Sequence, residues 1–194
     1  MKRIMSICVL FTFVLLYSCE RCRNTAYCEL ALVGRNYFDM YKEGAYWIYY
    51  NQDSSKVDSV YIINFENRYH KNTKEPCIEW NDITFNLENE YLNHGNVKVS
   101  IGNLGNCEIG SAHFLFSEGG GIVYKFRKGD TALTCPNVEC NVMQPFQLRG
   151  DPKYTFYEVT VYDSMYWFAP EFGLIQYVSY NKLDTFYLNK FVSK

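Results

Sequence analysis

The stretch AYWIYYNQDSSKVDSVYIINF, residues 45–65, decides the fold class. It holds two runs of aromatic and β-branched residues on either side of a polar segment, 51–55, that has the composition of a turn. Side chains in the second run alternate between two faces, with Val57, Tyr61 and Ile63 on the same face. The stretch therefore predicts an antiparallel hairpin.

Runs of the same kind recur along the rest of the chain between clusters of Gly, Asn, Asp and Pro, and no helical period of useful length interrupts them. They lie at 78–87, 97–101, 111–116, 122–127, 154–162, 174–180 and 185–192. We predict an all-β fold, a curved antiparallel sheet of roughly eight to ten strands that forms a half-barrel or an open barrel. A sandwich is the alternative that this pattern leaves open.

The first residues have the organisation of an export signal. Two cationic residues, Lys2 and Arg3, precede an apolar run without charge from Ile4 to Leu16. A run of this length is too short to span a bilayer, which takes about 20 apolar residues, but it fits the hydrophobic region of a cleaved signal. We therefore expect residues 1–18 to be removed from the mature protein.

The end of that signal, Leu16-Tyr17-Ser18-Cys19, resembles the lipobox of bacterial lipoproteins. The resemblance implies cleavage before Cys19 and acylation of that residue, so that the mature chain is anchored to the membrane by lipid. It also implies a bacterial cell-envelope location, at the outer membrane, on either the periplasmic or the surface side. The alternative is an ordinary secretory signal cut near Ser18, which would leave a soluble protein.

The mature chain is expected to contain an anchor and tether, residues 19–36, followed by a single β-rich domain, residues 37–194. Removal of the signal takes away two of the 19 basic residues and none of the 21 acidic ones, so the net charge falls from -2 to about -4. A mildly acidic domain without a basic patch does not favour nucleic acid as a partner.

Eight cysteines have three expected fates. Cys8 lies in the signal and Cys19 is the lipid site, which leaves an even set for pairing in an oxidising compartment. That set is Cys22, Cys28, Cys77, Cys107, Cys135 and Cys140. Six cysteines allow 15 pairings; close spacing suggests Cys22 with Cys28 and Cys135 with Cys140, which leaves Cys77 with Cys107.

A metal site is the alternative interpretation of the cysteines. It would combine Cys135 and Cys140 with His70, His94 or His113. Structural zinc sites usually present two close pairs of ligands, and this chain has no second close pair. We therefore favour disulfides and predict no metal and no cofactor.

Two further stretches carry a family resemblance. The first is Phe38-Asp39-Met40 followed by Gly44-Ala45-Tyr46-Trp47, and the second is Trp167-Phe168-Ala169-Pro170-Glu171-Phe172-Gly173-Leu174-Ile175. Together they resemble uncharacterised lipoproteins of the Bacteroidetes type, in which a Gly-x-x-Trp strand opens the domain and an aromatic-Ala-Pro-x-x-Gly-Leu turn lies near its end. The resemblance implies a concave antiparallel sheet and carries no chemistry with it.

Motifs for catalysis are weak. Ser111 lies in Gly-Ser-Ala-His, which lacks the Gly-x-Ser-x-Gly nucleophile elbow. Glu79 and Asp82 could serve a glycosidase only if they faced one cleft, and spacing alone does not establish that. We therefore predict that the protein is not an enzyme, with a hydrolase as the least favoured hypothesis.

The aromatic content, 18 Tyr, 14 Phe and 3 Trp, is the remaining signal. Aromatic side chains on both strand faces can line a groove for an apolar or amphiphilic ligand, contact another envelope protein, or stack against sugars. The candidate contact residues are Tyr46, Trp47, Trp80 and Trp167. The leading hypothesis is a non-enzymatic envelope binding module for such a ligand or partner, and the alternative is a glycan-binding accessory lipoprotein.

Overall fold

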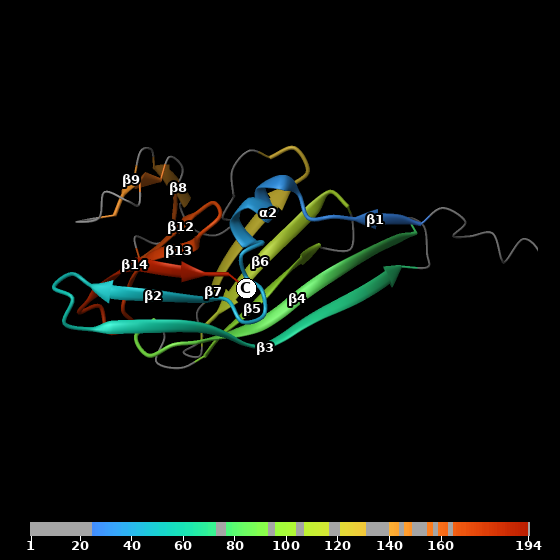
Figure 1. Cartoon of the computed structure of the whole chain (residues 1–194). Helices are drawn as coiled ribbons and strands as arrows, with labels where there is room; N and C mark the ends of the chain where they lie inside the picture. Colours follow the sequence, from blue (N-terminus) through green and yellow to red (C-terminus); the bar gives the residue numbers. More distant parts are fainter. Residues whose placement is uncertain are drawn as a thin grey trace, which may run out of the picture.

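The computed structural model describes residues 25–72, 77–92, 96–103, 107–116, 121–130, 140–143, 146–148, 155–156, 159–162 and 165–193. Figure 1 shows the arrangement of the elements. They are β1 (Ala26–Cys28), α2 (Leu32–Phe38), β2 (Tyr46–Asn51), β3 (Val57–Asn72), β4 (Ile78–Glu88), β5 (Asn96–Asn103), β6 (Ile109–Leu115), β7 (Gly121–Arg127), β8 (Cys140–Met143), β9 (Phe146–Gln147), β10 (Thr155–Phe156), β11 (Val159–Tyr162), β12 (Tyr166–Ala169), β13 (Gly173–Val178) and β14 (Thr185–Val192).

One curled sheet forms a half-barrel, and the predicted all-β, antiparallel architecture is confirmed (Figure 1). The strands follow the order β7-β6-β5-β4-β3-β2-β14-β13-β12-β11-β8, and β1 pairs with the beginning of β4 in a parallel sense. Each of the nine predicted runs contains a strand of this sheet. The short strands β1, β8 and β12 complete its twelve, and β9 and β10 form a separate two-stranded sheet.

The hairpin predicted from residues 45–65 is present as β2 and β3. Tyr46 pairs with Tyr61 and Tyr50 pairs with Val57. The Asn51 side-chain oxygen accepts a hydrogen bond of 2.9 Å from the backbone N–H of Lys56, which closes the turn. Beyond the hairpin, β3 continues to Asn72 through a bulge after Ile63, so β3 and β4 extend together as a long arm, with β1 paired to β4 at Ile78–Trp80 (Figure 1).

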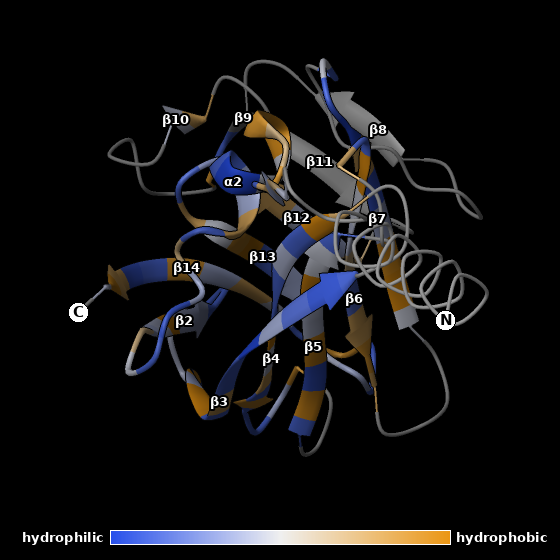
Figure 2. Ribbon diagram, turned by 90° about the vertical axis from the view of Figure 1, so that its right-hand side faces the viewer, coloured by the Kyte–Doolittle hydropathy of each residue, from blue (hydrophilic) through white to orange (hydrophobic). Residues whose placement is uncertain are grey.

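The inner face of the half-barrel is packed with aromatic side chains. The largest buried aromatic side chains, on the sheet and on the segment that contains α2, have at most 2% of their surface exposed; they are Trp47, Tyr37, Tyr41, Tyr49, Tyr124, Tyr177, Phe38, Phe85, Phe126, Phe168 and Phe186. Figure 2 shows the sheet curling around the segment that contains α2. The Phe38 ring of α2 lies 5.9 to 6.2 Å from the rings of Phe114, Tyr124 and Phe126, so the helix closes the core from the open side.

The N-terminal boundary of the domain lies earlier than expected from sequence. Residues 26–28 form β1, and Val33 and Tyr37 of α2 are buried in the core. The predicted tether therefore does not extend as far as residue 36. Within the part of the chain that the structure describes, no helix is long and apolar enough to cross a membrane.

A buried carboxylate joins three elements below the core. Asp58, on the inner side of β3, accepts hydrogen bonds from the Tyr177 hydroxyl and from the backbone N–H groups of Glu90 and Tyr91, the last two at 3.1 Å. Burial and the adjacent Asp58 charge raise the pKa of Tyr177 well above its ordinary value, so this hydroxyl stays a donor. These hydrogen bonds explain how the carboxylate of Asp58 can be buried among aromatic side chains.

Candidate functional site

The inner face of the half-barrel does not offer the predicted aromatic contact residue Trp47 to a ligand. Trp47 is 1% exposed; its indole N–H donates to the Phe172 carbonyl at 2.8 Å, and its ring stacks on Phe191. A ligand on this face would have to displace α2, whose Phe38 side chain is 2% exposed. Trp47 is therefore a core residue, and its predicted role as a contact residue is wrong.

The other three predicted contact residues lie in different places. Tyr46 points to the outer side of β2, Trp80 lies on the arm with its ring stacked 5.3 Å from the ring of His70, and Trp167 on β12 is half-buried against the core. The four residues do not form one site. Of the four, Tyr46 lies on the open outer side of β2.

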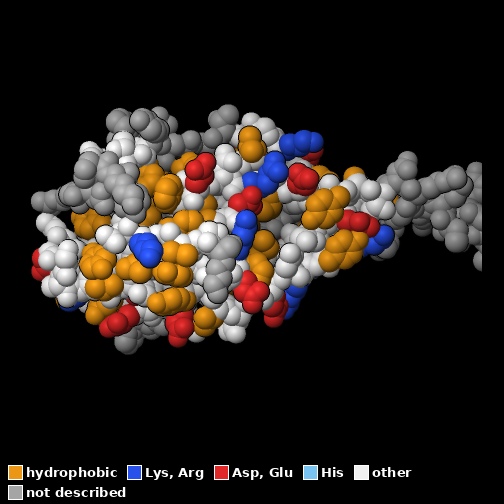
Figure 3. All heavy atoms as spheres, in the orientation of Figure 1, with side chains coloured by type: hydrophobic (Ala, Val, Ile, Leu, Met, Phe, Trp, Pro, Cys, Tyr) orange, Lys and Arg blue, Asp and Glu red, His pale blue; other side chains and the backbone are white. Residues whose placement is uncertain are grey.

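A patch of tyrosine and aliphatic side chains covers the outer side of β3, β2 and β14 (Figure 3). We call it the tyrosine face; it consists of Tyr46, Ile48, Tyr50, Val57, Tyr61 and Tyr187. Cross-strand register brings these residues together, because Tyr50 pairs with Val57 on one side and with Tyr187 on the other. The rings of Tyr46 and Tyr61 stack with centroids 5.7 Å apart.

The side chains of the tyrosine face are accessible to a partner. Tyr61 and Val57 are each 45% exposed, and Tyr46, Tyr50 and Tyr187 are half-buried. The same face includes Ser59 and Lys190, which pair with Ile48, and the largest exposed apolar patch of a monomeric protein is often functional. The members of the tyrosine face were missed from sequence apart from Tyr46, although the alternation of buried 47 and 49 with open 46, 48 and 50 carries the signal.

A second group of residues lies on the outer side of the arm and of β5 and β6. His70 Nε2 is 3.1 Å from Asp82 Oδ2, and Ser111 Oγ is 3.0 Å from His113 Nε2. Asp82 lies across Gly102 of β5, where an added Cβ would come within 1.8 Å of Oδ1. We call these four side chains the outer polar row. Its second pair was considered from sequence only through the Gly-Ser-Ala-His motif.

The outer polar row has the residue types of a hydrolase in a different arrangement. Ser111 is only 4% exposed, whereas a nucleophile has to reach its substrate. The carboxylate of Asp82 bonds His70, whereas the imidazole that contacts the serine is that of His113. Burial, together with the positive charge of Lys125, lowers the pKa of His113. These contacts describe two separate pairs and support a structural role for each.

The carboxylates considered for glycoside cleavage face opposite ways. Glu79 and Asp82 are three residues apart on β4, and side chains at odd separation in a strand point to opposite faces. Glu79 accepts a hydrogen bond of 2.7 Å from Lys71, and this contact, with one from Tyr69, lowers the pKa of the Glu79 carboxyl. The two cannot flank one sugar bond from opposite sides of a shared cleft.

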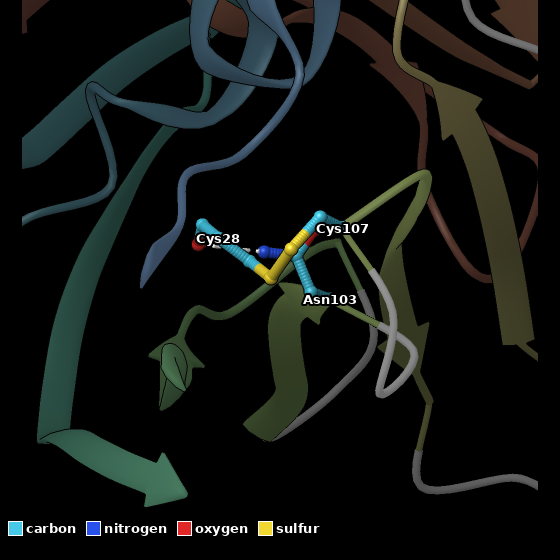
Figure 4. The surroundings of a disulfide bond; sticks show 3 residues. All are labelled: Cys28, Asn103 and Cys107. Atoms are coloured by element: carbon cyan, nitrogen blue, oxygen red, sulfur yellow. Dashed lines mark hydrogen bonds between the residues drawn. A yellow bond between two sulfur atoms is a disulfide. The ribbon is translucent and has the colours of Figure 1, made fainter. Parts of the chain in front are cut away.

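A disulfide joins Cys28 at the end of β1 to Cys107 before β6 (Figure 4). Beside it, the Asn103 side chain donates to the Cys28 carbonyl at 3.0 Å. Cys77 is also disulfide-bonded. The predicted pairings of Cys22 with Cys28 and of Cys77 with Cys107 are therefore wrong, because the register of β1 on β4 brings Cys28 close to a cysteine that is 79 residues away.

The remaining predicted cysteine sites fall outside what the structure describes. Cys19, Cys22 and Cys135 lie outside the described residues, and only the backbone of Cys140 is described. Among the side chains that are described, no three His, Cys, Asp or Glu residues are grouped so that they could hold a metal ion. Lipid attachment at Cys19 and pairing of Cys135 with Cys140 stay predictions.

Comparison with known proteins gives no relative. No protein-family model, no curated protein and no solved structure matches this chain.

Proposed function

We propose that this chain is an exported bacterial lipoprotein, acylated at Cys19, whose β-domain is a non-enzymatic binding module of the cell envelope. Its signal, a basic start followed by an apolar run that ends at Cys19, supports export and anchoring. The disulfide between Cys28 and Cys107 supports an oxidising compartment, since such bonds seldom persist in a reducing cytosol. Labelling with radioactive palmitate checks the anchor: wild type takes up label and the Cys19→Ala variant does not.

The observation that carries the binding role is the tyrosine face. The inner face of the half-barrel is filled, whereas the outer side of β3, β2 and β14 presents aromatic rings to solvent. Tyrosine is suited to recognition because it offers a large rigid ring and a hydroxyl at a low cost in side-chain entropy. We therefore place the binding surface on the outer side of the sheet and take an envelope partner as the first candidate.

A glycan is the second candidate ligand, and one observation favours it. The rings of Tyr46 and Tyr61 are stacked at an interplanar angle of 30° on the open side of two paired strands. Such a pair makes an extended aromatic platform, on which the apolar side of a sugar ring can lie while its hydroxyls reach water or the tyrosine hydroxyls.

Sedimentation with isolated envelopes tests the binding surface. The probe is residues 20–194, exported behind an ordinary secretory signal so that lipid insertion does not contribute. We expect saturable binding that falls at least tenfold in the Tyr46→Ser/Tyr61→Ser variant, because the stacked pair is lost. The matched control is Tyr69→Ser, which removes a tyrosine that is 58% exposed on the arm. Equal loss in both variants, or in neither, would contradict the proposal.

Pretreatment of the envelopes separates the two candidate ligands. Protease digestion abolishes binding if the ligand is a protein, and periodate oxidation, which cleaves vicinal diols of sugars, abolishes it if the ligand is a glycan. Protease treatment of intact cells, followed by detection of the domain, decides between the periplasmic and the surface side.

A further inference from the structure

The end of the domain that receives the tether is fixed in three ways. Strand β1 pairs with Ile78–Trp80 of β4, Cys28 is bonded to Cys107, and the Cys28 carbonyl accepts a hydrogen bond from Asn103. Immediately afterwards the chain enters α2, whose Val33 and Tyr37 are buried. The point at which the tether joins the body is therefore rigid relative to the sheet.

The tether itself is short. Only seven residue steps separate Cys19 from Ala26, where β1 begins. A fully extended chain covers at most about 3.6 Å per residue, so the beginning of β1 lies no more than about 25 Å from the acylated residue. This reasoning rests on the proposed function, because it requires lipid at Cys19. It follows that the beginning of β1 is held within about 25 Å of the acylated residue and hence near the lipid headgroups.

The surface at this end has the chemistry of a membrane interface. Tyr27 is 53% exposed and Leu32 is 64% exposed, although both are large and apolar. Both line an open depression of about 400 Å³, together with the cationic side chains of Arg35 and Lys128 and with Glu29, whose carboxylate lies 3.4 Å from the Arg35 guanidinium. Tyrosine rings and long cationic side chains are favoured at the headgroup level, where an apolar body and a polar tip are both solvated.

We infer that this end of the half-barrel docks on the phospholipid surface, with Tyr27 and Leu32 entering the interface and Arg35 and Lys128 contacting headgroup phosphates. We call this surface the docking end. A few apolar side chains beside a lipid anchor need only a small affinity of their own, because the anchor already supplies a high local concentration at the bilayer. Docking gives the domain, and with it the tyrosine face on β2, β3 and β14, a fixed orientation relative to the bilayer.

Photo-crosslinking to lipid tests the orientation. The mature full chain, with its own lipid, is reconstituted into phosphatidylethanolamine and phosphatidylglycerol vesicles that contain a phospholipid with a headgroup diazirine, and crosslinks are mapped by mass spectrometry. We expect most crosslinks on the segment from Tyr27 to Arg35. In the Tyr27→Ser/Leu32→Ser variant, the number of crosslinks on this segment should fall at least fivefold. Both side chains are more than half exposed, so they can be replaced without loss of the fold.

The control variant is Leu183→Ser, which removes a leucine that is 80% exposed in the turn between β13 and β14. It should keep the wild-type pattern. Crosslinks spread evenly over the domain, or concentrated on the tyrosine face, overturn docking. The mass of the N-terminal peptide distinguishes the two proposals: an acylated Cys19 with crosslinks elsewhere overturns docking alone, whereas an unmodified Cys19 overturns the anchor and, with it, docking.

Discussion

Phe126 illustrates how closely single residues are fitted in this core. Its side chain is fully buried, and its ring lies against two glycines on different elements, Gly34 of α2 and Gly110 of β6. A Cβ at Gly34 would come within 2.6 Å of the ring and a Cβ at Gly110 within 2.0 Å. Both glycines therefore serve close approach between the helix and the sheet.

The Gly34→Ala variant tests this packing, because this substitution ordinarily raises the stability of a helix, whereas here we expect it to lower the stability of the protein. Alanine in place of glycine inside a helix ordinarily stabilises by up to about 1 kcal/mol. Here the added methyl group overpacks Phe126, and we expect a net loss of about 1–2 kcal/mol in the free energy of unfolding, measured by urea denaturation. The loss should shrink in a Phe126→Leu background. A higher stability for Gly34→Ala would show that the ring is not held as described.

His113 gives a prediction about pH. Its pKa is lowered in the folded protein by burial and by Lys125, whereas an unfolded chain has the ordinary imidazole pKa of about 6.5. As the pH falls below that value, the unfolded chain takes up a proton that the folded chain resists, so stability present at pH 7.5 is lost toward the lower, folded pKa. Urea denaturation at pH 7.5 and pH 5 should show a smaller pH-dependent loss in His113→Gln than in wild type; an identical loss in both contradicts it.

The sequence predicts the longer strands, because their alternation is a local property, but it does not predict the shortest strands or the helix. The nine runs with period-two alternation all contain strands, since alternation depends only on neighbouring residues. β1 and β12 have three and four residues, too few for a period to show. The helix α2 has seven residues and was missed for the same reason, although Val33 with Tyr37 and Gly34 with Phe38, each pair four residues apart, mark its buried side.

Pairings between distant elements could not be predicted, because the sequence does not contain the register. The contact of His70 with Asp82 depends on the alignment of β3 with β4 across a bulge. The disulfide depends on β1 lying along β4, a parallel pairing that no hairpin turn specifies. Close spacing of cysteines was therefore a poor guide to their partners.

The disulfide makes its own prediction at this scale. The Cys28→Ala/Cys107→Ala variant should lose about 4–5 kcal/mol of unfolding free energy, the value expected for a closed loop of 79 residues. Hydrogen exchange should rise first at residues 26–28, because a three-residue strand has little other attachment. Peptide mapping without reduction checks the connectivity, and a peptide that joins Cys22 to Cys28 would contradict it.

In the whole molecule, one side of the sheet is packed in the core and the other side faces solvent. Alternation in residues 46–50 places Trp47 and Tyr49 in the core and leaves Tyr46 and Tyr50 outside. Aromatic abundance alone could not make that assignment, because it does not say which set faces inward. The all-β class was thus predictable, whereas the location of the candidate binding surface required the curvature of the sheet.

The fastening of β1 also determines how the domain carries mechanical load. A pull on the lipid anchor proposed at Cys19 would act along β1 and reach the covalent bond between Cys28 and Cys107. There the force divides between the backbone that continues into α2 and the bond to Cys107, which lies 79 residues further along the chain. A domain pulled between that anchor and a partner on the tyrosine face therefore receives the force at two points of the chain, Cys28 and Cys107, while the bond is intact.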